Sequence, residues 1–584
     1  MTKQSSVEKR NLVAQWAFDT RPVLLRFHLW LEDVEVERAQ KDPVSAHTFT
    51  PREIARCIAM TSAATALGTK LFGQFGEGKG KDKQEYNQVK KAADAVSAYM
   101  MSEGLWHLTR QLPENHALMV CLGEGLMPKA GETPEMGANP LLGFGRVYAR
   151  PEVARFVDEQ VRRLLNDPKP RFHDFYEALK KKNITVWGAA VDTLENTSRF
   201  AEGKNTGPMC VLHLFDSPLT VTRPYEAYFG NLTVPRAVAQ EAERRSVMLD
   251  WATPRAQVLD VIKTTYPGIK PANVHVWTLA GKSRVTRMSK LWDEWKKLGV
   301  HLVEDGWVAP TGIPTFNDSG TYAPTFLVKS WVDEKEEKHV FLCDGYAATA
   351  EAMQAASLSE VLDVDSTMSV LSPTFEKPHD EEYALMRSAP GENFSDLVMD
   401  PSLAEHYRES VRTAELSNVP LRHRTLRAQD FLPEKSWRVL ASVGYLSDDP
   451  YTGTLGVEKI DDLRYRVTTR LFTHAASSKI TFTLRLKEGL EESRLVFSPL
   501  LVRFLDGDDF RQRAVKISDS GRIRNELQTL ISQALEYDGD RIKVHFNRID
   551  EKVLPKAKQQ KIREILEWYL VEHPVWFEWL SLHG

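Results

Sequence analysis

Carboxylate side chains follow several apolar segments that the hydrophobic pattern predicts to be buried strands. In open α/β sheets, ligands bind beyond the carboxyl ends of the strands, so parallel strands would bring these side chains to one edge. Converging carboxylates repel one another unless a cation lies between them, and oxygen ligands suit Mg²⁺ or Mn²⁺. An Asp after a strand also commonly caps the next turn. The predicted metal ligands are Glu124, Asp192, Asp216 and Asp305, and the predicted acid–base catalysts are Asp344 and Glu304.

A predicted strand–helix–strand unit spans residues 274–305 and carries basic residues where its helix begins. The free N–H groups and the dipole of a helix N-terminus attract anions, and Lys and Arg add charge-assisted donors. We therefore expect this segment to bind a phosphate or carboxylate group, with solvated surface charges as the alternative interpretation. The predicted anion-binding residues are Lys282, Ser283, Arg284 and Arg287.

Two long segments, 123–145 and 306–326, are rich in Gly and Pro and show neither a helical nor a strand period. Loops of this length without secondary structure are uncommon in compact domains and usually serve function or are disordered. The second segment also carries many hydrogen-bonding side chains, which indicates a cleft beside the predicted sheet edge. These side chains are Thr311, Thr315, Asn317, Asp318, Ser319 and Tyr322.

The other motifs in the sequence give weaker support for a catalytic or binding site. Gly73 to Gly80 fits the letters G-x-x-x-x-G-K of a phosphate-binding loop, but a helix precedes it and Gly80 stands where Ser or Thr would hold Mg²⁺. Cys343 lies in an apolar run and is expected to be a buried thiol rather than a nucleophile. The sequence contains no H-E-x-x-H, no G-x-S-x-G and no G-x-G-x-x-G after a predicted strand, which weighs against those enzyme classes.

The elements that must position these residues alternate between strand and helix in the middle of the chain. This order predicts an α/β fold with a mixed, largely parallel central sheet, a helical N-terminal region and a C-terminal α+β region. Strands are predicted at 116–123, 184–192, 209–216, 274–281 and 300–305, and a hairpin at 326–345. The predicted regions are 1–115 (helical), 116–360 (α/β core), 361–435 (irregular or helical connector) and 436–584 (α+β).

Composition narrows the class of protein. The chain has 584 residues, and its 76 Lys and Arg against 80 Asp and Glu give a net charge of −4, without the basic footprint of a nucleic-acid-binding protein. No uninterrupted apolar run is long enough for a membrane span, and the N-terminus lacks a signal-peptide pattern. Four widely spaced Cys fit a reducing compartment, so we expect a cytoplasmic protein without membrane or nucleic-acid partners.

Together these patterns predict a cytosolic metabolic enzyme that acts on a phosphorylated or otherwise anionic small molecule with a divalent cation. The patterns do not distinguish phosphoryl transfer, ligation and hydrolysis. One alternative is a metal-independent enzyme that uses Asp344 or Glu304 as a general acid or base. Another is a non-catalytic scaffold or regulatory protein, in which the aromatic C-terminal segment 568–580 contacts a partner or a second copy of the chain.

Overall fold

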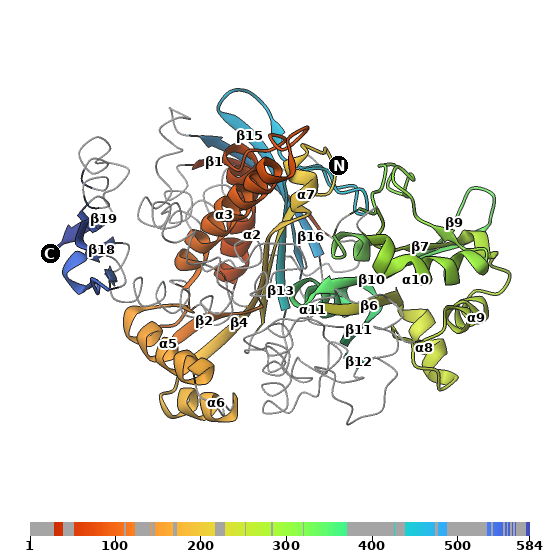
Figure 1. Ribbon diagram of the computed structural model, residues 1–584, viewed down its shortest axis with the longest axis horizontal. Helices are drawn as coiled ribbons and strands as arrows, with labels where there is room; N and C mark the ends of the chain where they lie inside the picture. Colours follow the sequence, from red (N-terminus) through yellow and green to blue (C-terminus); the bar gives the residue numbers. More distant parts are fainter. Residues whose placement is uncertain are drawn as a thin grey trace.

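The computed structural model arranges most of the chain around two β-sheets (Figure 1). No helix among the described residues is long and apolar enough to cross a membrane. The structure describes residues 29–38, 52–109, 112–122, 142, 147–166, 172–215, 228–251, 253–281, 284–318, 320–370, 425–426, 439–472, 477–486, 534–538, 541–552, 555–557, 559–560, 563, 567 and 580–584.

The first sheet combines strands from distant parts of the chain in the order β1-β16-β15-β13-β5-β4-β2-β3, with β14 beside β15. Its described strands are antiparallel to their neighbours except for the parallel pair β2 and β4. Its strands are β1 (Leu29–Arg38), β2 (His116–Leu122), β3 (Val147–Ala149), β4 (Thr185–Glu195), β5 (Met209–Phe215), β13 (Val439–Tyr445), β14 (Glu458–Lys459), β15 (Arg464–Phe472) and β16 (Ser477–Leu486).

The second sheet has the order β12-β11-β6-β10-β7-β8, with β9 beside β10. Only β7 pairs in parallel, with β10 on one side and β8 on the other, among the pairs that the structure describes here. Its strands are β6 (Tyr228–Pro235), β7 (Val274–Trp277), β8 (His301–Leu302), β9 (Lys329–Val332), β10 (Lys338–Ala348), β11 (Val364–Val370) and β12 (Thr425–Leu426).

A small third sheet lies apart from the other two, near the C-terminal end of the chain (Figure 1). It contains β17 (Leu535–Asp538), β18 (Arg541–His545) and β19 (Leu580–His583).

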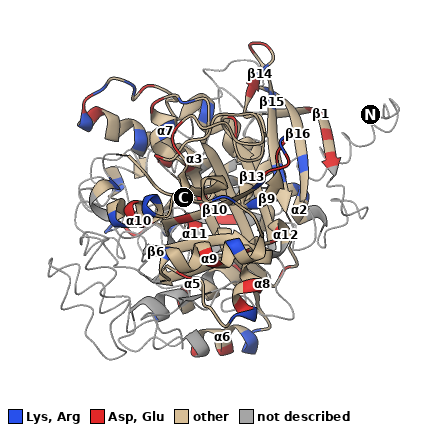
Figure 2. Cartoon of the chain, turned by 90° about the vertical axis from the view of Figure 1, so that its right-hand side faces the viewer, with Lys and Arg blue, Asp and Glu red and all other residues tan. Residues whose placement is uncertain are grey.

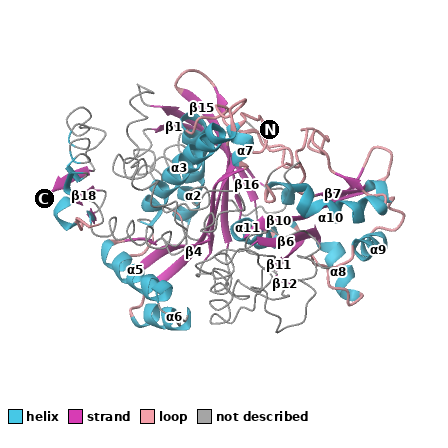
Figure 3. Cartoon of the chain, viewed as in Figure 1, coloured by secondary structure: helices cyan, strands magenta, loops and turns pink. Residues whose placement is uncertain are grey.

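Helices pack on both large sheets (Figure 3). The long helices α2 (Arg52–Phe72) and α3 (Lys83–Leu108) pack on each other and on the first sheet. The short helix α11 (Thr349–Ser357) contacts β4 of the first sheet and β6, β10 and β11 of the second. The other helices are α5 (Pro151–Asn166), α6 (Phe172–Lys181), α7 (Thr197–Ala201), α8 (Arg236–Arg244), α9 (Arg255–Thr265), α10 (Val285–Lys297) and α12 (Ser359–Leu362), with 3₁₀ turns at Pro271–Asn273, Ala323–Leu327 and Phe546–Arg548.

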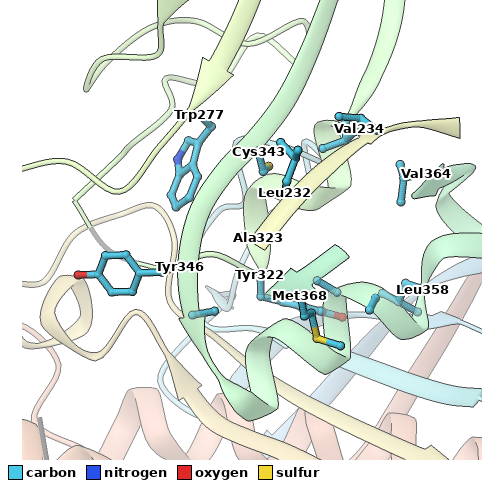
Figure 4. Packing of buried hydrophobic residues seen from close by; sticks show 14 of the residues in the cluster. Leu232, Val234, Trp277, Tyr322, Ala323, Cys343, Tyr346, Leu358, Val364 and Met368 are labelled. Carbon is cyan, nitrogen blue, oxygen red and sulfur yellow. The ribbon is translucent and has the colours of Figure 1, made fainter. Parts of the chain in front are cut away.

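Strand β5 shows how the core is divided. Its side chains alternate between two apolar clusters: Cys210 and Leu212 belong to the one that includes α2, whereas Val211 and Phe215 belong to the other. This second cluster also contains Trp277 and Tyr322, together with the other side chains of Figure 4. Both faces of the first sheet are therefore covered, which is why its strands are apolar almost throughout.

The prediction of a largely parallel central sheet is wrong, because most described strand pairs are antiparallel. The sequence pattern misleads for a physical reason: near-continuous apolar runs are typical of parallel strands buried on both faces, and here an antiparallel sheet is buried on both faces. The α/β mixture of helices and strands itself is confirmed.

The predicted N-terminal region is not wholly helical, since β1 lies within it and pairs with β16. Pairing of β5 with β13 likewise joins the predicted α/β core to the C-terminal region. The division at 115, 360 and 435 stays a prediction, although strand pairing crosses its boundaries.

Close contact between α2 and the first sheet depends on Gly444 in β13. A Cβ atom there would lie 2.4 Å from the carbonyl oxygen of Ser62 and 2.8 Å from Sγ of Cys210. We expect Gly444→Ala to lower the free energy of unfolding by about 1–3 kcal/mol, because the methyl group must push the helix away from the sheet. Urea unfolding measures this change, and unfolding identical to wild type would contradict the tight contact.

Candidate functional site

Asp344, predicted as an acid–base catalyst, lies in a closed ion pair inside the second sheet. Its two carboxylate oxygens accept hydrogen bonds from Nε and Nη2 of Arg255, each at 2.7 Å, and Oδ2 also accepts one from Nε1 of Trp295 at 2.7 Å. Both members of the pair are 0% exposed. The remaining Arg255 nitrogen, Nη1, donates to the carbonyl groups of Trp251 and Thr253. This pair joins α9, α10 and β10 and leaves Asp344 no access to a substrate.

Glu304 and Asp305 follow β8, at the outer edge of the second sheet rather than beside Asp192 of β4. Glu304 is largely exposed and accepts a hydrogen bond from Nε2 of His301 at 2.6 Å. Asp305 accepts a hydrogen bond from the backbone N–H of Asn317 at 3.3 Å, a contact with the polar loop 306–326 rather than a cap of the next turn. The predicted carboxylates thus belong to two different sheets.

Several predicted residues lie outside the described part of the structure. Glu124, Asp216, Lys282 and Ser283 are among them, as are the segments 123–141 and 143–146 of the first long loop. For Arg287, the backbone belongs to α10 but the side chain lies outside the described set.

Arg284 is placed directly before the first turn of α10, as predicted. Its Nη1 donates to the hydroxyl group of Tyr346 at 2.6 Å, and its guanidinium lies 5.6 Å from the centre of that ring. Its Nε is buried and forms no hydrogen bond to any described residue. Helix α10 itself carries both basic and acidic residues (Figure 2). The feature that could attract an anion to its N-terminus is therefore Arg284 rather than the net charge of the helix.

Three carboxylates converge where the two sheets meet. Asp192 and Glu195, from β4, and Glu351, from the first turn of α11, each present an oxygen atom within 4.8 Å of the other two. Asp192 and Glu195 are each only 2% exposed. The pairing of β4 with β5 shifts register between these two residues, and this irregularity brings both carboxylates toward α11. Carboxylates at such separation favour a bound cation or a shared proton.

The predicted polar loop 306–326 covers this cluster. Thr321 donates from its hydroxyl group to Oε2 of Glu351 at 2.8 Å. The backbone of Gly320 passes so close that a Cβ atom would lie 2.4 Å from Oε1 of Glu195 and 2.1 Å from Oδ1 of Asn196. Its φ of +74° also favours glycine. At Gly320 the loop therefore approaches Glu195 with backbone, whereas at Thr321 it approaches Glu351 with a side chain.

An ion pair holds the same loop to α7. Nη1 of Arg199 donates to Oδ1 of Asp318 at 2.6 Å, and the Arg199 guanidinium lies 4.3 Å from the centre of the Phe316 ring. The Arg199 side chain is 8% exposed and that of Asp318 is 40% exposed, so the arginine is shielded from water and the carboxylate is only partly so. Asp318, one of the predicted polar-ligand residues, is thus engaged in anchoring the loop.

His213 connects the loop and α11 to the first sheet from within. Its Nδ1 lies 3.0 Å from Oγ of Ser357 in α11, and its Nε2 lies 3.0 Å from the hydroxyl oxygen of Tyr322 in the loop. Complete burial lowers the pKa of His213 to about 3, so the ring is neutral at physiological pH. It therefore holds together the two elements that supply Thr321 and Glu351.

Gln354, one helical turn after Glu351, shares its face of α11. Its amide nitrogen donates to the carbonyl oxygen of Ala190 at 3.2 Å, two residues before Asp192 in β4. The side chain is 0% exposed, and its Oε1 forms no hydrogen bond to any residue that the structure describes. This oxygen is a further potential ligand beside the carboxylates.

The carboxylate cluster and the start of α10 meet at one end of β10. A Cβ atom on Gly345 would lie 3.6 Å from Cγ2 of Thr321 and 3.8 Å from the backbone nitrogen of Leu279. The next residue, Tyr346, is the partner of Arg284. The backbone N–H of Ala280 also donates to the carbonyl oxygen of Asn317 at 2.7 Å. The carboxylate cluster and the predicted anion-binding helix start thus both lie beside the loop 315–321.

Two other features singled out in the sequence, the Gly73–Gly80 segment and Cys343, have structural rather than chemical roles. In the Gly73–Gly80 segment, the N–H groups of Gly76 and Gly78 donate to carbonyl groups of α7 at 3.1 and 2.9 Å and are not available to a phosphate. Cys343 is buried, and burial raises the pKa of its thiol well above the ordinary value, which opposes thiolate formation.

Sequence reasoning included Asp192 but missed Glu195 and Glu351. The missed signal is the pattern Asp192-Thr193-Leu194-Glu195, which places two carboxylates on one side only if the strand contains a bulge. Glu351 follows a predicted hairpin strand, but β4, which carries Asp192 and Glu195, is distant from it in sequence.

No protein-family model matches this chain, and no curated protein is detectably similar to it in sequence.

Proposed function

We propose that this protein is an enzyme that binds a divalent cation between Asp192, Glu195 and Glu351 and acts on a phosphorylated or otherwise anionic small molecule. The observation that supports the proposal most directly is the convergence of three carboxylates from β4 and α11 beneath the loop 315–321. A set of oxygen ligands alone suits Mg²⁺ or Mn²⁺.

In this proposal, Arg284 and the N-terminus of α10 bind the anionic group of the substrate, with Lys282, Ser283 and Arg287 as the further donors expected from the sequence. The partly buried guanidinium of Arg284 offers charge-assisted hydrogen bonds. The shared loop 315–321 would hold the anion and the cation close together, which favours phosphoryl transfer, ligation or hydrolysis. Asp344 has no catalytic role here because Arg255 and Trp295 occupy its oxygens.

We expect Glu351→Gln to weaken Mg²⁺ binding by at least about 10-fold, because the affinity of an oxygen site depends on the number of charged ligands. Isothermal titration of the chelator-treated full chain with MgCl₂ and MnCl₂ measures this loss. The melting temperature of wild type should also rise with Mg²⁺, since a ligand that binds only the folded state stabilises it, whereas that of the variant should rise less.

Glu152→Gln is the matched control, because Glu152 also lies in the first turn of a helix, α5, but outside this cluster. It should bind Mg²⁺ like wild type. Absence of Mg²⁺ and Mn²⁺ binding by wild type, or equal binding by Glu351→Gln, would remove the cation from the proposal. Substrate turnover that survives EDTA would instead favour the metal-independent acid–base enzyme.

A further inference from the structure

Three histidine rings form a continuous hydrogen-bonded chain at the edge of the second sheet, separate from the carboxylate cluster. Nε2 of His301 lies 2.6 Å from Oε2 of Glu304, and Nδ1 of His301 lies 2.7 Å from Nδ1 of His275. Nε2 of His275 lies 2.9 Å from Nδ1 of His339. The chain ends where Nε2 of His339 lies 3.3 Å from Oδ2 of Asp333.

Three neutral rings can share protons along this chain in one direction. A neutral imidazole carries one N–H, and a hydrogen bond between two ring nitrogens holds one proton. Since the Glu304 carboxylate only accepts, His301 donates from Nε2, His275 donates from Nδ1 to His301, and His339 donates from Nδ1 to His275. Nε2 of His339 is then left with a lone pair directed at Asp333.

A ring nitrogen and a carboxylate at this separation share either a proton or a metal cation. Nε2 of His339 is buried, and Asp333 is its ion-pair partner. Ligand atoms of Asp333, Glu337 and His339 all lie within 4.8 Å of one another. The three residues therefore present one nitrogen and two carboxylates around a common point.

The spacing and chemistry of these atoms suit a transition metal. Zinc bonds of about 2.0–2.1 Å at a tetrahedral angle separate two ligand atoms by about 3.3 Å, which is the distance between Nε2 of His339 and Oδ2 of Asp333. An imidazole ligand favours Zn²⁺ or Co²⁺ over Mg²⁺. Metal-bound histidines usually donate their other N–H to an acceptor that fixes the ring, and His275 is placed to accept here.

The surrounding residues hold the rings and the carboxylates in place. The indole of Trp331 stacks on His339, with ring centres 5.4 Å apart and planes 9° apart. Oδ1 of Asp333 accepts hydrogen bonds from the backbone N–H groups of Lys335 and Glu337, at 2.9 and 2.8 Å. Lys270 and Asn273 hold the Glu337 carboxylate. Such preorganisation is typical of a binding site.

We propose that the hairpin formed by β9 and β10 binds a zinc-type transition-metal ion through Nε2 of His339 and the carboxylates of Asp333 and Glu337. The fourth position is left to water or an external ligand. The chain from His275 through His301 to Glu304 orients the histidine ligand without touching the metal.

Titration of the chelator-treated full chain with CoCl₂, followed by displacement with ZnCl₂, tests this site. Wild type should bind one Co²⁺ here with the visible absorption of a four-coordinate ion. His339→Gln and Asp333→Asn should each weaken binding at least about 100-fold, because a direct ligand is lost. Glu304→Gln should weaken it about 10-fold through the histidine chain.

Glu336→Gln is the control, since Glu336 lies in the same turn but outside the metal-ligand set, and it should bind Co²⁺ like wild type. Thermal unfolding without metal verifies that each variant is folded. Co²⁺ binding that persists in both His339→Gln and Asp333→Asn would overturn the proposal, as would the absence of binding by wild type. Loss of Co²⁺ binding in Glu351→Gln alone would place the ion in the carboxylate cluster and would also overturn it.

Discussion

Replacing Asp344 by alanine is expected to lower the free energy of unfolding by about 3–5 kcal/mol, one of the largest effects of any single substitution in this protein. The reason is that Arg255 would remain charged and buried after losing its bidentate partner. Nε1 of Trp295 would lose its acceptor as well. Denaturant unfolding followed by circular dichroism measures the loss.

Two further variants test whether the loss of stability in Asp344→Ala comes from the broken buried ion pair. Asp260→Ala removes the partner of Arg245 in an exposed pair and should cost much less, because water screens surface ion pairs. The double variant Asp344→Ala with Arg255→Met should recover part of the lost stability, since no buried charge is left unpaired. A single Asp344→Ala variant as stable as Asp260→Ala would contradict the structural role and return Asp344 to the list of candidate catalysts.

Acidification is expected to destabilise the wild-type protein by about 3 kcal/mol more than a His213→Gln variant between pH 7 and pH 4.5. Burial lowers the pKa of His213 in the folded state to about 3, against 6.5 in the unfolded chain. Below pH 6.5 the unfolded chain binds a proton that the folded protein does not. The stability contribution of a neutral His213 is therefore fully present above pH 6.5 and is lost progressively as the pH falls toward 3.

Urea unfolding of both proteins at several pH values tests this expectation, and the quantity compared is the change within each protein. Burial raises the pKa of Asp449 to about 6, which has the opposite effect on acid stability, but both proteins contain Asp449 and its contribution cancels. Parallel pH profiles for wild type and His213→Gln would show that His213 is not buried as a neutral ring between Tyr322 and Ser357.

Local patterns are sufficient to locate many elements of this chain. Strands β2, β4 and β5 lie where strands were predicted at 116–123, 184–192 and 209–216, and the hairpin of β9 and β10 begins in the predicted segment 326–345. Residues between neighbouring predicted strands form α8 and α10. Periodicity and turn residues suffice because they reflect which faces of a short segment are buried.

The partners of each strand depend on the tertiary structure. Apolar runs in β4 and β5 reveal burial but not direction, and the two strands turn out to be antiparallel. Strand β1 joins β16 across almost the whole length of the chain. No local pattern encodes such a pairing, because it is selected by the total burial of distant surfaces.

For the candidate sites, too, the local sequence determines one part and the tertiary structure the other. Composition and spacing marked Asp192, Arg284 and the loop 306–326 as polar positions next to strands or a helix start. Only the packing of α11 against β4 brings Glu351 to Asp192 and Glu195, and only the alignment of β7, β8 and β10 brings His275, His301 and His339 together. A side chain's chemistry is carried by its residue type, whereas its partners are decided by which distant surfaces exclude water together.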